Sequence, residues 1–240
     1  MHDGSLQPLV IAPIDFEPVA VLFDMDGLMI ESERALLDCW RQAARQLRLD
    51  LDDDLWLAMV GLHERACDAL LRERLEEAEA RALVAGMNTL YEGRVAAGLP
   101  LKPGVLELLA VLVERGLPKA VVTSTPRVRA EPKLARCGLL PHFTTVITGS
   151  DVRHPKPAPD IYLLAAQTLG VDPQRCVVLE DSAPGVRAAL AAGMTPIQVP
   201  DLVAPDVEVR ALGHRIVDSL KHALALIEPA LQRRAAPASS

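Results

Sequence analysis

The spacing of apolar residues changes along the chain and predicts two kinds of structure. Residues 19–23 form a short, continuous apolar run, which is typical of a strand buried on both faces of a parallel sheet. From residue 32 to residue 98, apolar residues recur at helical spacing among alanine, arginine and glutamate. Interruptions at residues 50–54, at Gly61 and at Gly86 divide this stretch into about four expected helices.

Strand and helix patterns alternate after a linker at residues 99–104. Strands are expected at residues 119–123, 144–148, 176–179 and 195–199. Helices are expected at residues 105–115, 128–137, 160–169 and 183–192. Pro132 is expected to delay or kink the second of these helices. This alternation predicts an α/β fold, a Rossmann-like parallel sheet with helices on both faces and right-handed crossovers.

The two patterns define the expected domains. Residues 18–31 and 99–230 form the α/β core, and residues 32–98 form an all-helical cap domain inserted after the first strand. Residues 1–17 show no clear period and are expected to be a flexible leader, and residues 231–240 a flexible tail. Open sheets of this kind bind ligands at the carboxyl ends of their strands, so the residues at those ends decide the function.

Composition and charge narrow the class of protein. The chain has 240 residues, of which 50% are hydrophobic, enough for one core domain and a smaller inserted one. The formal net charge of −7 argues against nucleic acid as a partner. No apolar stretch approaches ~20 residues and the chain lacks a secretory start, so we expect no membrane span and no export.

The four cysteines form no Cys-x-x-Cys pair, which argues against a zinc ribbon or a thioredoxin-type motif. We therefore expect reduced thiols in a cytoplasmic protein. For its assembly, the expectation is a monomer or a weak homodimer.

The first candidate chemistry lies at the end of the first expected strand. Asp24 and Asp26 are two residues apart, so their side chains point the same way, and Gly27 allows a sharp turn after them. One carboxylate can attack phosphorus, and the other can carry the proton to or from the leaving oxygen. Taken alone, the pair is equally compatible with a turn that carries helix-capping acids.

Two further strand ends carry groups that suit a phosphate ester. Thr123 and Ser124 follow an apolar strand, where a hydroxyl and a backbone N–H can hold a phosphoryl oxygen. The alternative is an N-cap for the next helix. Lys156 lies between two prolines that restrict the backbone and aim its ammonium, the alternative being a solvated loop lysine.

Glu180 and Asp181 follow the apolar run of the fourth strand-like segment. Adjacent buried acids are costly unless they are paired or bound to a cation, and Mg²⁺ prefers one or two carboxylates together with phosphate oxygens and water. The alternative is that Asp181 caps the helix that begins near Pro184. The joint pattern of four such strand ends is far more specific than any one of them.

Four segments closely resemble the haloacid dehalogenase superfamily of phosphatases. They resemble in particular its branch with a helical cap, which includes β-phosphoglucomutases and sugar-phosphate phosphatases. The matching segments are residues 23–33, 122–124, 156–162 and 179–186. Their order and spacing agree with the family, and the likeness runs from about residue 19 to residue 227.

The resemblance implies a Mg²⁺ site and a covalent mechanism. Asp24 would be the nucleophile and a Mg²⁺ ligand, and Asp26 would be the general acid/base and ligate Mg²⁺ through its carbonyl. Asp181 would ligate Mg²⁺, and Glu180 would ligate it directly or through water. The metal would help to stabilise the charge on the transferring phosphoryl group.

The resemblance also implies how the phosphate is held and what the cap does. Thr123 and its neighbour Ser124 would hold the phosphoryl group, and Lys156 would balance its charge. Residues 61–65 resemble the specificity loop of the cap, so His63 and Arg65 are candidates to reach a phosphate or sugar hydroxyl. The alternative for both is an ordinary solvated residue at the start of a helix.

Three departures from related patterns refine the expected reaction. Glu31 stands where the family usually has aspartate, a conservative change near the expected hinge. Leu36 stands where the family's mutases commonly carry histidine, which favours hydrolysis. Asp26 argues against dehalogenation, because haloacid dehalogenases lack this second aspartate.

Three functions follow from the sequence, in order of preference. The first is a Mg²⁺-dependent phosphatase that hydrolyses a small phosphorylated metabolite, a sugar phosphate above all, through an aspartyl phosphate. The second is a phosphomutase of the β-phosphoglucomutase type. The third is a binding protein that keeps the fold without turnover.

Overall fold

The core of the molecule is a six-stranded parallel sheet with the strand order β3-β2-β1-β4-β5-β6. The computed structural model describes residues 11–60 and 64–232, without the side chains of residues 64 and 65. The strands are β1 (Ala20–Phe23), β2 (Lys119–Thr123), β3 (Thr145–Thr148), β4 (Cys176–Glu180), β5 (Thr195–Gln198) and β6 (Arg215–Ile216). The predicted α/β class and parallel sheet are confirmed.

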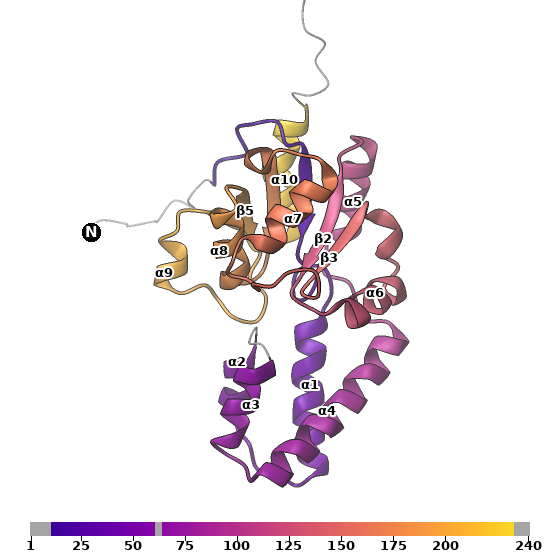
Figure 1. Ribbon diagram of the computed structural model, residues 1–240, viewed down its shortest axis with the longest axis vertical. Coiled ribbons are helices and arrows are strands. Elements are labelled where there is room, and N and C mark those ends of the chain that lie inside the picture. Colours follow the sequence, from indigo (N-terminus) through magenta and orange to yellow (C-terminus); the bar gives the residue numbers. More distant parts are fainter. Residues whose placement is uncertain (1–10, 61–63, 233–240) are drawn as a thin grey trace, which may run out of the picture.

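Alternate residues of each central strand serve opposite faces of the sheet. In β1, Val21 and Phe23 join one hydrophobic cluster, whereas Ala20 and Leu22 join another. The first cluster includes residues of α5 (Val105–Glu114), α6 (Arg127–Arg136) and α10 (Leu220–Gln232). The second includes residues of α7 (Asp160–Leu169) and α8 (Ala183–Ala191). The helices therefore cover both faces (Figure 1), which is why the strands read as continuous apolar runs.

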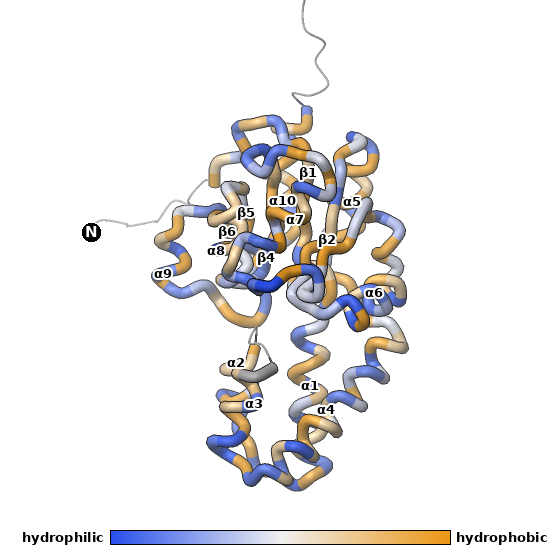
Figure 2. Tube along the Cα trace, in the orientation of Figure 1, coloured by the Kyte–Doolittle hydropathy of each residue, from blue (hydrophilic) through white to orange (hydrophobic). Residues whose placement is uncertain are grey.

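The inserted segment is helical and has a hydrophobic core of its own. Its helices are α1 (Ser32–Gln46), α2 (Asp53–Met59), α3 (Glu64–Arg72) and α4 (Glu77–Ala97). The rings of Trp40 and Trp56 stack at its centre, with their centroids 5.9 Å apart. Figure 1 shows these helices standing at one end of the sheet domain, and Figure 2 shows hydrophilic residues gathered at their far end.

Several details of the prediction were wrong. Gly86 does not break a helix; it lies within α4, whose capping box at Glu76 marks the real boundary. Pro132 lies inside α6, which begins at Arg127 after Pro126. The sequence patterns also missed β6, the short helix α9 (Val207–Arg210) and α10.

The expected leader is in part a packed segment. Ile14 is buried in the first hydrophobic cluster, and its backbone N–H donates to the carbonyl of Leu226 in α10. The guanidinium of Arg215 donates to the carbonyls of Ala12 and Pro13. Residues 11–17 are therefore not a loose leader. At the other end, Leu231 is buried in α10, so the tail cannot begin at residue 231.

Two neighbouring segments, residues 29–31 and 100–102, connect the helical segment to the sheet domain. The backbone N–H of Glu31 donates to the carbonyl of Pro100, and that of Lys102 donates to the carbonyl of Met29. These connections lie just beyond the end of β1 and bring the helices to the carboxyl ends of the strands (Figure 1). Across the described ranges, no helix combines the length and apolar character that crossing a membrane would need.

Candidate active site

The central strands β1, β2 and β4 bring the predicted residues to one edge of the sheet. Phe23, the last residue of β1, pairs with Val121 of β2 and with Leu179 of β4, so the ends of the three strands lie within two residues of one another. Asp24 follows directly, and its backbone N–H donates to the carbonyl of Leu179 over 3.0 Å. Its side chain is buried beside the ends of both neighbouring strands.

A buried ion-pair triad forms the centre of the site. The ammonium nitrogen of Lys156 lies 2.6 Å from Asp24 Oδ1 and 2.6 Å from Glu180 Oε1. It also donates to the carbonyl of Val122 over 3.0 Å. The Lys156 side chain is only 4% exposed, so it is not the solvated loop lysine of the alternative interpretation. Its charge links the ends of three strands.

Glu180 is fully engaged by protein groups. Its Oε1 accepts hydrogen bonds from Lys156 and from the hydroxyl of Tyr162, and its Oε2 accepts from the N–H and hydroxyl of Ser182. Burial acts to raise the pKa of this carboxyl, but the charge of Lys156 and the hydrogen bonds from Lys156, Ser182 and Tyr162 together hold the pKa below the usual value. The structure thus places Glu180 beside Asp24 as the anchor of Lys156. Its ligation of Mg²⁺, directly or through water, stays a prediction.

Asp24 and Asp26 have different environments despite being two residues apart. Burial raises the pKa of Asp24 to about 7, against the opposing charge of Lys156. Burial also acts to raise the pKa of Asp26, but the charge of Lys133 and the hydrogen bonds that Asp26 accepts together hold this pKa below its usual value. Lys133 Nζ lies 2.6 Å from Asp26 Oδ1, and the hydroxyl of Thr125 donates to Asp26 Oδ2 over 2.7 Å.

The predicted phosphate-holding residues differ in accessibility. Thr123 is buried at the end of β2, and its Oγ1 accepts a hydrogen bond from the N–H of Thr125 over 3.1 Å. A hydroxyl that accepts one bond still has its own proton to donate. Ser124 is exposed. Neither side chain caps α6, whose N-cap position is occupied by Pro126.

Asp181 lies against the turn that follows the paired aspartates. Gly27 has a φ of 76°, and a Cβ at this position would collide with Asp181 Oδ2. Burial, followed by the charges of Asp24 and Glu180, raises the pKa of Asp181 well above its usual value. Asp181 does not cap α8, because Ser182 does so through its hydrogen bond from Gly185.

The donor set at this edge fits a hard divalent cation. The charge of Asp24 helps to raise the pKa of Asp181, as expected for two carboxylates that share a site a cation would neutralise. Within the described residues, no group of three His, Cys, Asp or Glu side chains has the arrangement of a metal cluster. Two carboxylates with a backbone carbonyl, such as that of Asp26, match the sparse protein ligation typical of Mg²⁺.

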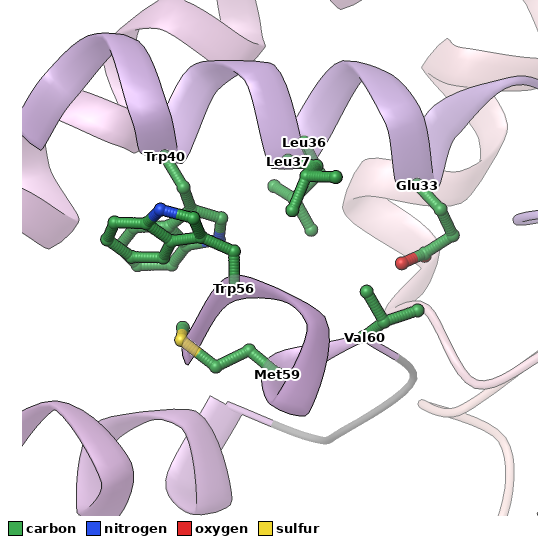
Figure 3. A pocket seen from close by; sticks show the side chains of 7 residues that line it. All are labelled: Glu33, Leu36, Leu37, Trp40, Trp56, Met59 and Val60. Carbon is green, nitrogen blue, oxygen red and sulfur yellow. The ribbon is translucent and has the colours of Figure 1, made fainter. Parts of the chain in front are cut away.

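The helical domain has a shallow pocket between α1 and α2 (Figure 3). Its lining is apolar except for one carboxylate and consists of Glu33, Leu36, Leu37, Trp40, Trp56, Met59 and Val60. Two predicted substrate contacts cannot be placed: His63 lies outside the described residues, and so does the side chain of Arg65.

Sequence reasoning missed the residues that surround the predicted ones. Tyr162 and Ser182 hold Glu180, while Thr125 and Lys133 hold Asp26. One signal was available: Lys133 belongs to the buried face of α6, and a lysine on an otherwise apolar helix face requires a partner.

Comparison with known proteins agrees with this geometry. Residues 19–193 match the family described as haloacid dehalogenase-like hydrolase. The chain is 34% identical over 179 residues to a phosphorylated carbohydrates phosphatase of Thermotoga maritima, covering 74% of this chain and 83% of that protein. It is 35% identical over 182 residues to hexitol phosphatase A of Escherichia coli, covering 74% and 81%.

A solved structure gives the same result. The crystal structure of a haloacid dehalogenase family hydrolase from Deinococcus radiodurans, with bound phosphate and sodium, matches with a TM-score of 0.75 and 31% identity. The match covers 90% of this chain and 98% of that one. The chain therefore belongs to the haloacid dehalogenase-like hydrolases, and it is an enzyme.

The packing of Glu180 against α8 gives a test of the triad. A Cβ at Gly185 would collide with the Glu180 carboxylate, whereas nothing lies within 4 Å of a Cβ at Gly93 in α4. We expect Gly185→Ala to lower the free energy of unfolding by about 1–3 kcal/mol through overpacking. We expect Gly93→Ala to raise it by about 0.5–1 kcal/mol through helix propensity.

Urea unfolding of the two variants beside the wild type measures both effects. Both glycines are helical, so propensity alone would stabilise both variants. A Gly185→Ala protein as stable as Gly93→Ala would contradict the close approach of Glu180 to α8.

Proposed function

We propose that the protein is a Mg²⁺-dependent phosphatase that hydrolyses a small phosphorylated carbohydrate through an aspartyl phosphate on Asp24. The observation that carries this proposal is the buried triad in which Lys156 lies 2.6 Å from both Asp24 and Glu180. It fixes a carboxylate at a strand end and places a permanent positive charge beside it. Burial acts to lower the pKa of Lys156, but the carboxylates Asp24 and Glu180 raise it well above its usual value.

The first step transfers the phosphoryl group to the protein. A carboxylate oxygen of Asp24 attacks phosphorus, and the bond between phosphorus and the ester oxygen breaks. The leaving oxygen takes the electron pair of that bond and a proton from Asp26, which enters this step in its protonated form. Thr123 binds a phosphoryl oxygen, and the nearby charge of Lys156 balances that of the phosphoryl group.

The second step returns the enzyme to its starting state. Asp26, now a carboxylate, accepts a proton from a water molecule as that water attacks phosphorus. The bond between phosphorus and Asp24 breaks, which releases inorganic phosphate and the free Asp24 carboxylate. Mg²⁺ held by Asp24, Asp181 and the Asp26 carbonyl would supply positive charge to the phosphoryl oxygens throughout.

Two arguments support a sugar-phosphate substrate and hydrolysis. The two curated relatives described above are phosphatases of phosphorylated carbohydrates and of hexitols by name. Leu36 lies one turn into α1 and lines the pocket of Figure 3, where it offers no group to transfer a proton. That favours release of phosphate to water over its return to a second sugar oxygen.

The proposal also covers the location of the enzyme in the cell and its binding partner. None of the four cysteines forms a disulfide in the described structure, which supports a cytoplasmic location. The partner we propose is the phosphorylated metabolite itself.

A screen of phosphate esters tests the proposal. We expect Mg²⁺-dependent release of inorganic phosphate by the wild type, and a fall in kcat on the order of 10⁴-fold or more in Asp24→Asn, because the amide cannot act as the nucleophile. Removing Mg²⁺ with a chelator should abolish the wild-type activity and restoring it should recover the rate. The exposed Asp218 provides a matched control, because Asp218→Asn removes one carboxylate away from the site.

Two outcomes would contradict the proposal. If the folded wild type released no phosphate from a broad panel of phosphate esters with Mg²⁺, the proposed hydrolase activity would be contradicted. Equal ligand binding by the wild type and Asp24→Asn, with turnover by neither, would support a binding protein instead.

The phosphomutase alternative is separated by its product. With β-glucose 1-phosphate as substrate and a bisphosphate primer, a mutase forms glucose 6-phosphate. We expect inorganic phosphate without the isomer, because Leu36 cannot relay a proton between two sugar oxygens. Product analysis by ³¹P NMR distinguishes the two, and accumulation of glucose 6-phosphate would favour the mutase.

A further inference from the structure

Lys133 is a second buried cation at the site, and the proposed reaction does not use it. It lies on α6, on the helix face that also carries the buried residues Ala130 and Leu134. Its side chain is 6% exposed. A buried ammonium is costly without a partner, so this lysine must be held by specific contacts.

The contacts of Lys133 are Asp26 and Tyr91. Its ammonium nitrogen lies 2.6 Å from Asp26 Oδ1 and 5.3 Å from the centre of the Tyr91 ring. Burial acts to lower the pKa of Lys133, but Asp26 and Tyr91 together outweigh it and raise the pKa above its usual value. The Lys133 ammonium therefore stays charged beside Asp26.

Asp26 is held by both of its carboxylate oxygens. Lys133 of α6 donates to Oδ1, and Thr125, from the loop after β2, donates to Oδ2 over 2.7 Å. Two donors on different oxygens fix the rotation of the carboxylate plane, which a single hydrogen bond would leave free. The orientation of Asp26 is therefore set from the sheet domain, independently of the triad around Lys156.

We propose that Lys133 is a positioning residue that, together with Thr125, aims the Asp26 carboxyl group at the ester oxygen. This inference rests on the proposed function, because it assigns to Lys133 the task of orienting the acid/base of that reaction. A carboxyl group displaced by about 1 Å transfers its proton far less efficiently, because general acid catalysis needs a heavy-atom distance of about 2.6–3.2 Å.

Tyr91 connects this arrangement to the helical domain. It belongs to α4, and its ring packs against the core cluster while facing the Lys133 ammonium. Burial, followed by the charge of Asp26, raises the pKa of Tyr91 to about 12, so the phenol stays neutral. Lys133 is thus enclosed where α4 meets α6, which keeps water from competing for its hydrogen bonds.

The leaving group of the substrate separates positioning of the acid from a general structural role. 4-Nitrophenolate is stable as an anion and leaves without a proton, whereas phenolate is more basic and gains from protonation. Phenyl phosphate and 4-nitrophenyl phosphate differ only in the nitro group, so they form a matched pair of probes. The value of kcat/KM reports the steps up to cleavage of the ester bond and excludes the later hydrolysis of the aspartyl phosphate.

The test compares Lys133→Met with the wild type on both esters in the presence of Mg²⁺. We expect kcat/KM for phenyl phosphate to fall about 10²-fold, the lower end of a general acid's contribution, and that for 4-nitrophenyl phosphate to change less than about threefold. Lys133→Arg should recover part of the loss, because it keeps a cation at this position. Thr125→Val removes the other hydrogen bond to Asp26. It should also lower kcat/KM for phenyl phosphate relative to that for 4-nitrophenyl phosphate.

Lys119→Met is the matched control. Lys119 is also buried, and its ammonium donates to the carbonyl of Leu117 in the sheet domain, with no contact to Asp26. We expect this variant to keep the wild-type ratio between the two esters. Circular dichroism and thermal unfolding of each variant establish that it is folded, and Thr125→Val carries the test should Lys133→Met not fold.

The outcomes separate this inference from the proposed function. Equal losses of kcat/KM on both esters in the folded Lys133→Met or Thr125→Val protein would overturn the positioning role of Lys133. The proposed phosphatase function would still hold in that case if the wild type were active and the Asp24→Asn variant inactive. A wild type inactive on both esters and on the wider panel would overturn both. A loss confined to phenyl phosphate would support both.

Discussion

The arrangement of the site depends on one buried cation, Lys156, shared by two carboxylates. Its ammonium holds Asp24 at the end of β1 and Glu180 at the end of β4, each at 2.6 Å. Neither carboxylate could remain charged at this depth alone, because desolvation favours the neutral form. The hydrogen bonds of Tyr162 and Ser182 to Glu180, and the bare backbone of Gly185 against it, all serve to keep that cation in place.

The two aspartates that follow β1, Asp24 and Asp26, have separate surroundings. Asp24 lies beside Glu180 and Asp181, and burial raises its pKa to about 7. Asp26 forms an ion pair with Lys133, and the pKa of Asp26 lies below the usual value despite burial. Their surroundings therefore move the pKa values of these two neighbouring carboxyl groups in opposite directions. A divalent cation between Asp24 and Asp181 would favour the charged form of both.

The sequence predicts those parts of the fold that depend on local pattern. The central strands were predicted because each is an uninterrupted apolar run, and their carboxyl ends placed Asp24, Thr123 and Glu180 together. Gly86 misled because a long helix with a capping box tolerates one glycine. Ile14 lies among residues without period, and its burial depends on α10, which lies more than two hundred residues away in the chain and packs beside it.

The details of the site depend on contacts between distant segments. Glu180 and Asp181 read alike in sequence, as adjacent acids after a strand. Only the position of Tyr162 on α7 and Ser182 on the following turn shows that the first is an anchor. Lys133 lies 107 residues from Asp26, and a lone lysine in a helix is usually taken as exposed. Its place on the apolar face of α6 is the single sequence feature that marks it.

The central claim is that Asp24 itself carries the phosphoryl group. It is tested most directly by quenching the enzyme in acid during turnover of a good substrate with Mg²⁺ and mapping the peptides by mass spectrometry. The account predicts the added mass of one phosphoryl group on the peptide that contains Asp24, which disappears once the substrate is exhausted. A phosphoryl group on another residue would contradict it. So would active turnover that yields no phosphorylated peptide under conditions that slow the hydrolysis of the aspartyl phosphate.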